Sequence, residues 1–145
     1  MPKEVIPPAA LSPRSASILI VEDDAAIGEF LQQLIEEETP YHTTVVPDGP
    51  HALEAAQQLH PCLLLLDYRL PGINGIELYD LLQQMKETRG VPAIMMSATL
   101  PTQELERRGI HSLRKPMDIG NVIRMITHAL VTFDEQRLRE NVQYL

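Results

Sequence analysis

The stretch that decides the fold reads CLLLLDYRLPG and covers residues 62–72. Its apolar run, from Cys62 to Leu66, ends shortly before a Pro-Gly turn signal. An uninterrupted apolar run of this length predicts a strand that is buried on both faces, as in a parallel sheet covered by helices. Asp67 would then stand at the carboxyl end of the strand, where open α/β sheets bind ligands. A single acid in this place could equally start the next loop, since Asp is common in turns.

Upstream of this run the hydrophobic pattern alternates between two periods. SILIVE at 17–22 and the β-branched HTTVV at 42–46 predict strands. Between them, apolar residues over 27–35 follow one stripe of an amphipathic helix that ends before Pro40. A turn signal then leads into a second helix whose apolar residues span 52–59.

The alternation continues downstream. Apolar residues over 78–85 again have helical spacing, and VPAIMMS at 91–97 predicts a fourth strand. The segment 102–109 allows at most two helical turns, and 111–115 predicts a short fifth strand. A last helix follows over 119–130, after Asp118 as a candidate cap.

Five strands alternating with five helical segments predict an α/β fold with a doubly wound, five-stranded parallel sheet flanked by helices. We expect a flexible, Pro-rich N-terminal arm over 1–16. The folded domain should cover 17–133, and the polar segment 134–145 should form a C-terminal helical extension or tail.

Composition excludes several classes of function. With 12 Lys and Arg against 20 Asp and Glu, the net charge of −8 opposes direct binding to nucleic acid or to anionic membranes. Cys62 is the only cysteine, so the chain can form neither an internal disulfide nor a thiolate metal cluster. We find neither a signal peptide nor a membrane span, and we therefore expect a cytoplasmic protein.

Polar side chains follow four of the predicted strands, and they are Glu22, Asp23, Asp67, Ser97 and Lys115. Because the carboxyl ends of parallel strands share one rim, these side chains should converge. Crowded carboxylates raise one another's pKa unless a cation neutralises them, and Mg²⁺ prefers such oxygen ligands. A carboxylate there can also accept a phosphoryl group. The acids at 22–24 alone could instead form a solvated helix start, with Asp24 as the cap.

The chain resembles the response-regulator receiver domains of two-component signalling. Four motifs carry the resemblance in the family's order across about residues 17–131: ILIVEDD, LLLLDYRLPGINGIEL, MMSA and RKP. The resemblance implies the flavodoxin-like receiver fold, Mg²⁺ as cofactor, and Asp67 as the phosphoacceptor. It also implies a cis peptide before Pro116.

The resemblance assigns roles to the other converging residues. Asp23 would bind the metal directly, Glu22 through water, and Arg69 through its backbone carbonyl, with Asp67 completing the metal set. The Ser97 hydroxyl would follow the phosphoryl group, and Lys115 would be its cationic partner.

Two departures from the family pattern concern output. The family usually has an aromatic residue three positions before the lysine, where this chain has Ser112. The segment from Ser97 to Lys115 is about one helical turn short, so we expect the fourth helix to be short or absent. We therefore expect phosphorylation to change residues 68–75 and 97–103 more than 110–114.

The leading interpretation is a stand-alone, chemotaxis-type response regulator, which accepts a phosphoryl group from a histidine kinase or phosphotransfer protein and signals through protein contacts. It would catalyse only its own Mg²⁺-dependent phosphorylation and dephosphorylation. The alternative is a receiver-like interaction scaffold with a decayed switch. A phosphatase using Asp67 as nucleophile is weaker, because that family has a second Asp where this chain has Arg69. A dinucleotide-binding domain is weaker still, since no Gly-x-Gly-x-x-Gly follows the first strand.

Overall fold

The computed structural model describes residues 16–99 and 101–142, and it describes side chains as far as residue 132. The arm predicted over 1–16 therefore lies outside the described residues except for Ala16. The described chain contains one parallel sheet of five strands in the order β2-β1-β3-β4-β5. In chain order the strands are β1 (Ser17–Val21), β2 (His42–Val46), β3 (Leu63–Asp67), β4 (Ala93–Ser97) and β5 (His111–Arg114).

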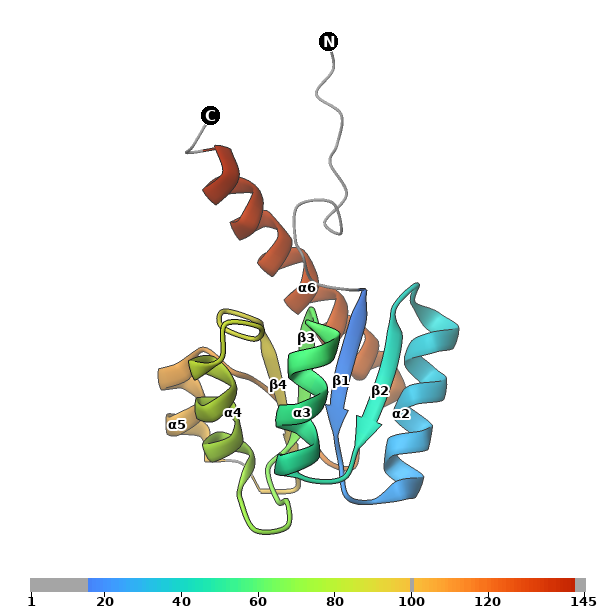
Figure 1. The fold of residues 1–145 in the computed structure, drawn as a ribbon. Coiled ribbons are helices and arrows are strands. Elements are labelled where there is room, and N and C mark those ends of the chain that lie inside the picture. Colours follow the sequence, from blue (N-terminus) through green and yellow to red (C-terminus); the bar gives the residue numbers. More distant parts are fainter. Residues whose placement is uncertain (1–15, 100, 143–145) are drawn as a thin grey trace.

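In the described part of the chain, five helices connect and follow these strands: α2 (Ala25–Glu38), α3 (Gly49–Leu59), α4 (Gly75–Gln84), α5 (Thr102–Arg108) and α6 (Ile119–Val142). They cover both faces of the sheet (Figure 1). Helices α2 and α6 pack on one core and α3, α4 and α5 on the other. The predicted doubly wound fold is confirmed.

The three central strands are buried along their whole length. Alternate residues of β3 point to opposite faces, with Leu63 and Leu65 in one core and Leu64 and Leu66 in the other. This double burial explains why the run carries no polar residue before Asp67.

Short polar residues fix where the helices begin. The Asp24 carboxylate accepts hydrogen bonds from the N–H groups of Ala26 and Ile27, so Asp24 caps α2 as predicted. Asn74 and Glu77 form a reciprocal capping box at the start of α4. Asp118 accepts a hydrogen bond from the Gly120 N–H at 2.8 Å before α6. Each cap starts a helix close behind a strand or its loop.

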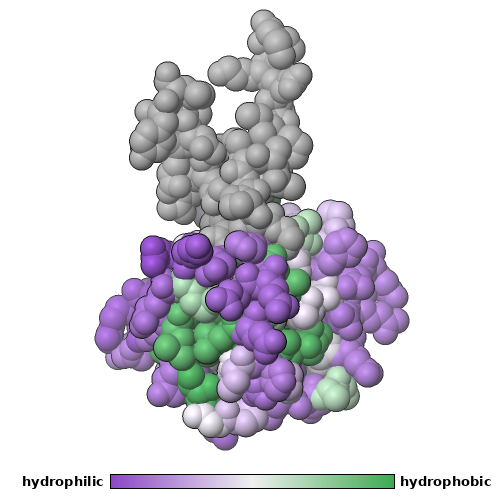
Figure 2. All heavy atoms as spheres, in the orientation of Figure 1, coloured by the Kyte–Doolittle hydropathy of each residue, from purple (hydrophilic) through white to green (hydrophobic). Residues whose placement is uncertain are grey.

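The last two helices differ in length. Helix α5 is the fourth helix in chain order and has 7 residues, which confirms the prediction that the fourth helix is short. Helix α6 has 24 residues and projects beyond the sheet (Figure 1). The predicted boundary between the folded domain (17–133) and the C-terminal extension (134–145) stays a prediction. No helix among the described residues is long and apolar enough to cross a membrane. Hydrophilic residues cover most of the described surface in Figure 2, with smaller hydrophobic areas between them.

Candidate functional site

Strand order brings the predicted site residues together. Strand β3 lies beside β1 and β4, and the registers pair Val21 with Leu66 and Asp67 with Met96. The segment after β1, the end of β3 and the end of β4 therefore share one rim of the sheet. Strand β5 continues this rim, because the N–H of Lys115 donates to the carbonyl of Ser97 at 3.0 Å.

Three carboxylates meet at this rim. Glu22, Asp23 and Asp67 each offer an oxygen atom within 4.8 Å of the others. Glu22 and Asp67 are buried, with relative exposures of 2% and 5%, whereas Asp23 is exposed. The cluster thus has a buried floor and one carboxylate facing solvent.

The Lys115 side chain reaches across the rim to the two buried acids. Its Nζ lies 2.8 Å from Oε1 of Glu22 and 3.2 Å from Oδ2 of Asp67. Burial opposes its charge, but the hydrogen bond to Glu22 and the negative charges of both acids outweigh this effect and raise the pKa of Lys115. Lys115 therefore supplies a fixed positive charge beside Asp67. The Lys115–Pro116 peptide is cis, as predicted.

The crowding of the carboxylates changes the pKa of Glu22. Burial, followed by the contact with Asp67, raises the pKa of Glu22 to about 7, and the hydrogen bond from Lys115 only partly opposes this shift. In the absence of a cation, part of the Glu22 population is thus protonated near neutral pH. A bound cation would favour the ionised form.

Ser97 and Arg69, the two other predicted site residues, make fewer contacts in the structure than Lys115 does. Ser97 is buried at 3% exposure, and its Oγ accepts a hydrogen bond from the Thr99 N–H at 3.3 Å. The Arg69 N–H donates to Oδ1 of Asp67 at 3.1 Å. This N–H contact was not predicted, because no side-chain pattern signals it, and the role of the Arg69 carbonyl stays a prediction.

Backbone hydrogen bonds hold the loop after Asp67 against the start of α4. The Gly75 N–H donates to the Tyr68 carbonyl at 2.7 Å, and Arg69 and Asn74 form a β-bridge. A β-carbon at Gly75 would lie 2.4 Å from the Met95 sulfur and 2.6 Å from the Asp67 carbonyl oxygen. The role of Gly75 was not predicted, because a glycine in a turn-rich segment gives no sign of a close backbone approach.

The donor set suits a hard divalent cation. It consists of carboxylate oxygens on a partly open rim, and Mg²⁺ is usually bound by one or two carboxylates with its remaining positions left to water or a phosphate. Among the described residues this is the one such group of at least three acidic, His or Cys side chains. These residues therefore fit Mg²⁺.

Comparison with known proteins relates the chain to one family. The family model of the response regulator receiver domain matches residues 18–127. The DNA-binding response regulator MtrA of Mycolicibacterium paratuberculosis is 40% identical over 88 residues, which are 61% of this chain and 37% of MtrA. The polar-differentiation response regulator DivK of Brucella ovis is 34% identical over 91 residues, which are 63% of this chain and 73% of DivK. The chain thus spans little more than a third of the length of MtrA.

Solved structures show the same fold. The receiver domain of the Francisella response regulator 1452 has a TM-score of 0.70 and 26% identity, covering 80% of this chain and 97% of that one. A CheY-like receiver domain protein from Methanospirillum hungatei has a TM-score of 0.76 and 23% identity, covering 83% of this chain and 97% of that one.

Proposed function

The chain belongs to the response regulator receiver domain family, and from this premise we propose that it accepts a phosphoryl group on Asp67 in a phosphorelay. The observation that carries the proposal is the meeting of Glu22, Asp23 and Asp67 within 4.8 Å, with the Lys115 Nζ 3.2 Å from Asp67. Family members are signalling proteins, and we propose that this one catalyses only its own phosphorylation and dephosphorylation.

The reaction forms an acyl phosphate. An Asp67 carboxylate oxygen attacks the phosphorus atom of a phosphohistidine on a histidine kinase or phosphotransfer protein. The P–O bond forms as the P–N bond breaks, and the electron pair of that bond stays with the imidazole, which then takes up a proton. The buried position of Asp67 at the strand end leaves one rim for the donor to approach.

Other residues of this chain stabilise the transferred group. Lys115, already held beside Asp67, is placed to pair with a phosphoryl oxygen. The Ser97 hydroxyl, on the neighbouring strand, is the proposed hydrogen-bond donor to another. Asp23, Asp67, the Arg69 carbonyl and, through water, Glu22 would hold Mg²⁺, which when bound neutralises negative charge on the phosphoryl oxygens.

The proposal also covers where this protein acts and how it passes on its signal. We propose that this receiver acts in the cytoplasm and passes its signal on by protein contacts. The excess of acidic residues supports protein contacts over direct binding to nucleic acid.

Phosphoryl uptake can be measured directly by intact-protein mass. Incubation with acetyl phosphate and Mg²⁺ should add one phosphoryl group to the wild type and none to Asp67→Asn. Asp24→Asn is a matched control, because this acid caps α2 outside the carboxylate cluster. An unmodified wild type would reject the proposal and leave the alternative of an interaction scaffold, and modified Asp67→Asn would place the acceptor elsewhere.

Mg²⁺ binding should depend on pH through Glu22. Its folded pKa of about 7 means that Mg²⁺ must displace a proton below neutral pH, so affinity should fall as pH is lowered from about 8 to about 6. Titration monitored by the amide signal of Asp67 can measure this. Glu22→Gln should flatten the pH profile, whereas Asp23→Ala should abolish binding; unchanged binding in Asp23→Ala would refute the metal assignment.

A further inference from the structure

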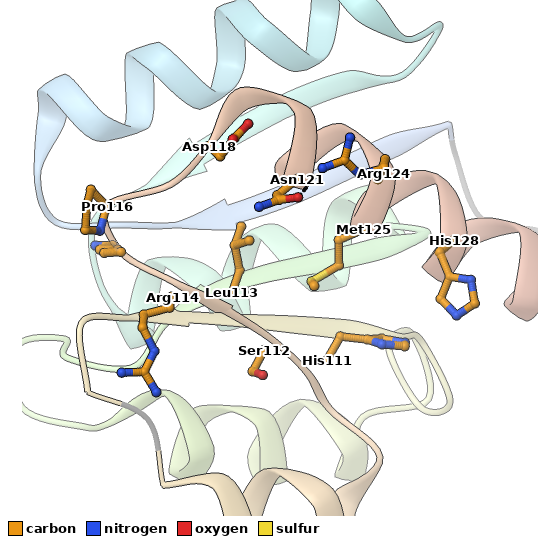
Figure 3. A pocket seen from close by; sticks show the side chains of 11 residues that line it. His111, Ser112, Leu113, Arg114, Pro116, Asp118, Asn121, Arg124, Met125 and His128 are labelled. Carbon is orange, nitrogen blue, oxygen red and sulfur yellow. Dashed lines mark hydrogen bonds between the residues drawn. The ribbon is translucent and has the colours of Figure 1, made fainter.

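A groove of about 620 Å³ runs beside β5 (Figure 3), and Lys115, which contacts the carboxylate cluster, lines part of it. Strand β5 forms one wall, and the first turns of α6 form the other through residues such as Asn121, Arg124 and Met125. Its volume lies within the range of ordinary ligand sites. In Figure 3, His111 and His128 lie at one end, and Pro116 lies at the other.

The groove follows the edge of the sheet. Leu113 points into the core beneath α2 and α6, and strand geometry directs Ser112 and Arg114 to the opposite face. Residues from both faces of β5 nevertheless line the same groove. A groove lined from both faces of an edge strand must run along its open side.

The outer backbone groups of β5 are open to binding. The Lys115 N–H bonds to Ser97 on β4, and alternate residues of a strand direct their backbone groups to opposite sides. The N–H and C=O groups of Ser112 and Arg114 therefore point away from β4. Both residues are exposed, and within the described part of the chain no backbone or side-chain group bonds to these outer groups.

The charge of the groove is opposite to that of the whole chain. Arg114 and Arg124 line it, and neither forms an ion pair with a described residue. Asp118 is the only acid among the described residues of the lining, and its carboxylate accepts a hydrogen bond from the Gly120 N–H. Lys115 is already paired with Glu22 and Asp67. On a chain of net charge −8, this groove is therefore suited to an acidic ligand.

We propose that β5 binds an acidic protein segment in extended conformation, which adds a sixth strand to the sheet. Backbone hydrogen bonds to Ser112 and Arg114 would hold the segment, and its carboxylates would pair with Arg114 and Arg124. A second copy of β5 fits less well, because pairing the two edges would bring the basic residues of both copies together. The proposal does not rest on phosphorylation of Asp67.

A defined peptide can test this. The probe is an acetylated, amidated peptide that repeats Val-Glu-Glu-Val, so that each face of its strand carries carboxylates, and the control replaces glutamate with lysine. Binding to the whole chain should slow amide exchange at Ser112 and Arg114 by about tenfold or more at saturation, because both N–H groups leave water for hydrogen bonds. The lysine peptide should have no such effect. Binding that protects other elements instead, or no binding at millimolar peptide, would overturn the proposal.

Variants separate the backbone contribution from the charge contribution. Ser112→Pro removes an outer N–H and should abolish binding, whereas Ser112→Thr keeps it and should bind like the wild type. Arg114→Gln and Arg124→Gln should each weaken binding by about two- to fivefold, with less dependence on salt. Lys86→Gln removes a charge outside the groove and should have no effect.

A change in the peptide guards against misfolding of the proline variant. Methylating alternate backbone nitrogens of the peptide removes the donors on one of its edges and leaves the charges unchanged. A peptide methylated at alternate nitrogens keeps one edge of donors and should still bind through it, whereas a peptide methylated at every nitrogen should not bind. Binding by the fully methylated peptide, or protection of Ser112 and Arg114 by dimerisation without peptide, would show that strand addition by an acidic segment is wrong.

Discussion

The two edge strands of the sheet, β2 and β5, differ in what meets their outer backbone groups. On β2, the Thr43 N–H donates to Oε2 of Glu36 at 2.9 Å, and the Thr43 carbonyl accepts from the Gln32 side chain at 3.2 Å. Both partners belong to α2. On β5, the equivalent groups of Ser112 and Arg114 meet no hydrogen-bond partner in the described part of the chain.

The difference follows from how closely a helix approaches each edge. Helix α2 comes so near β2 that a β-carbon at Gly28 would lie 2.8 Å from a methyl carbon of Val45. Its long polar side chains can therefore reach the strand. Helix α5 has only 7 residues, and α6 leaves the groove between itself and β5. Since an open edge invites pairing with another chain, closing one edge leaves the other as the place where such pairing is possible.

The largest expected effect is a loss of stability on removing the buried side chain that anchors β5, the open edge. Leu113 is the one buried residue of β5, and Leu113→Ala should lower the free energy of unfolding by about 2–5 kcal/mol, because it leaves a cavity beneath α6. Val45→Ala on the half-buried β2 should cost only about 1 kcal/mol. Urea unfolding measures both. Equal losses would show that the two edges are anchored alike.

A second test opens the closed edge. Glu36→Ala removes the acceptor of the Thr43 N–H, so Thr43 amide exchange should speed up by about tenfold while the exchange at Ser112 stays unchanged. Glu36→Gln keeps an uncharged acceptor and should have a smaller effect. If Thr43 stays protected in Glu36→Ala, the carboxylate does not close this edge.

The same contact predicts a dependence on pH. The hydrogen bonds from Thr43 lower the pKa of Glu36 below its ordinary value of 4.5. A carboxylate with a lowered folded pKa contributes stability above its unfolded pKa, and this contribution is lost as pH falls through the folded value. Protection of the Thr43 amide should therefore decrease below about pH 4 and remain constant above about pH 5. Exchange measured across this range in wild type and Glu36→Gln would test the assignment.

The smallest expected effect concerns the short helix near the open edge. Arg108 of α5 donates to both carboxylate oxygens of Asp80 on α4, at 2.8 and 2.9 Å. Asp80 is 46% exposed, so Asp80→Asn should cost only about 0.2–1 kcal/mol, and salt should reduce the loss. A double-mutant cycle with Arg108→Gln isolates the pair. A coupling energy of zero would mean that packing alone holds α5.

The central strands and their rim were predictable from sequence, because burial on both faces leaves an apolar run that ends in a polar residue. Leu63 to Leu66 followed by Asp67 is such a run. The contacts that finish the edges were not predictable. Glu36 has the sequence signature of a solvated helix position, and only the folded structure brings it to Thr43. Arg108 and Asp80 are 28 positions apart, and no local period connects them.

The tight packing at Gly75 has a consequence for the range of sequences this loop can accept. If residues 72 and 75 were both randomised and folded variants selected, the two glycines should behave differently. Gly72 has φ of 76° with open space around its Cα, so asparagine and aspartate should appear there among the survivors. At Gly75, a β-carbon would meet the main chain of Asp67 and Tyr68, which cannot move without displacing the phosphoacceptor candidate. Only glycine should survive at that position.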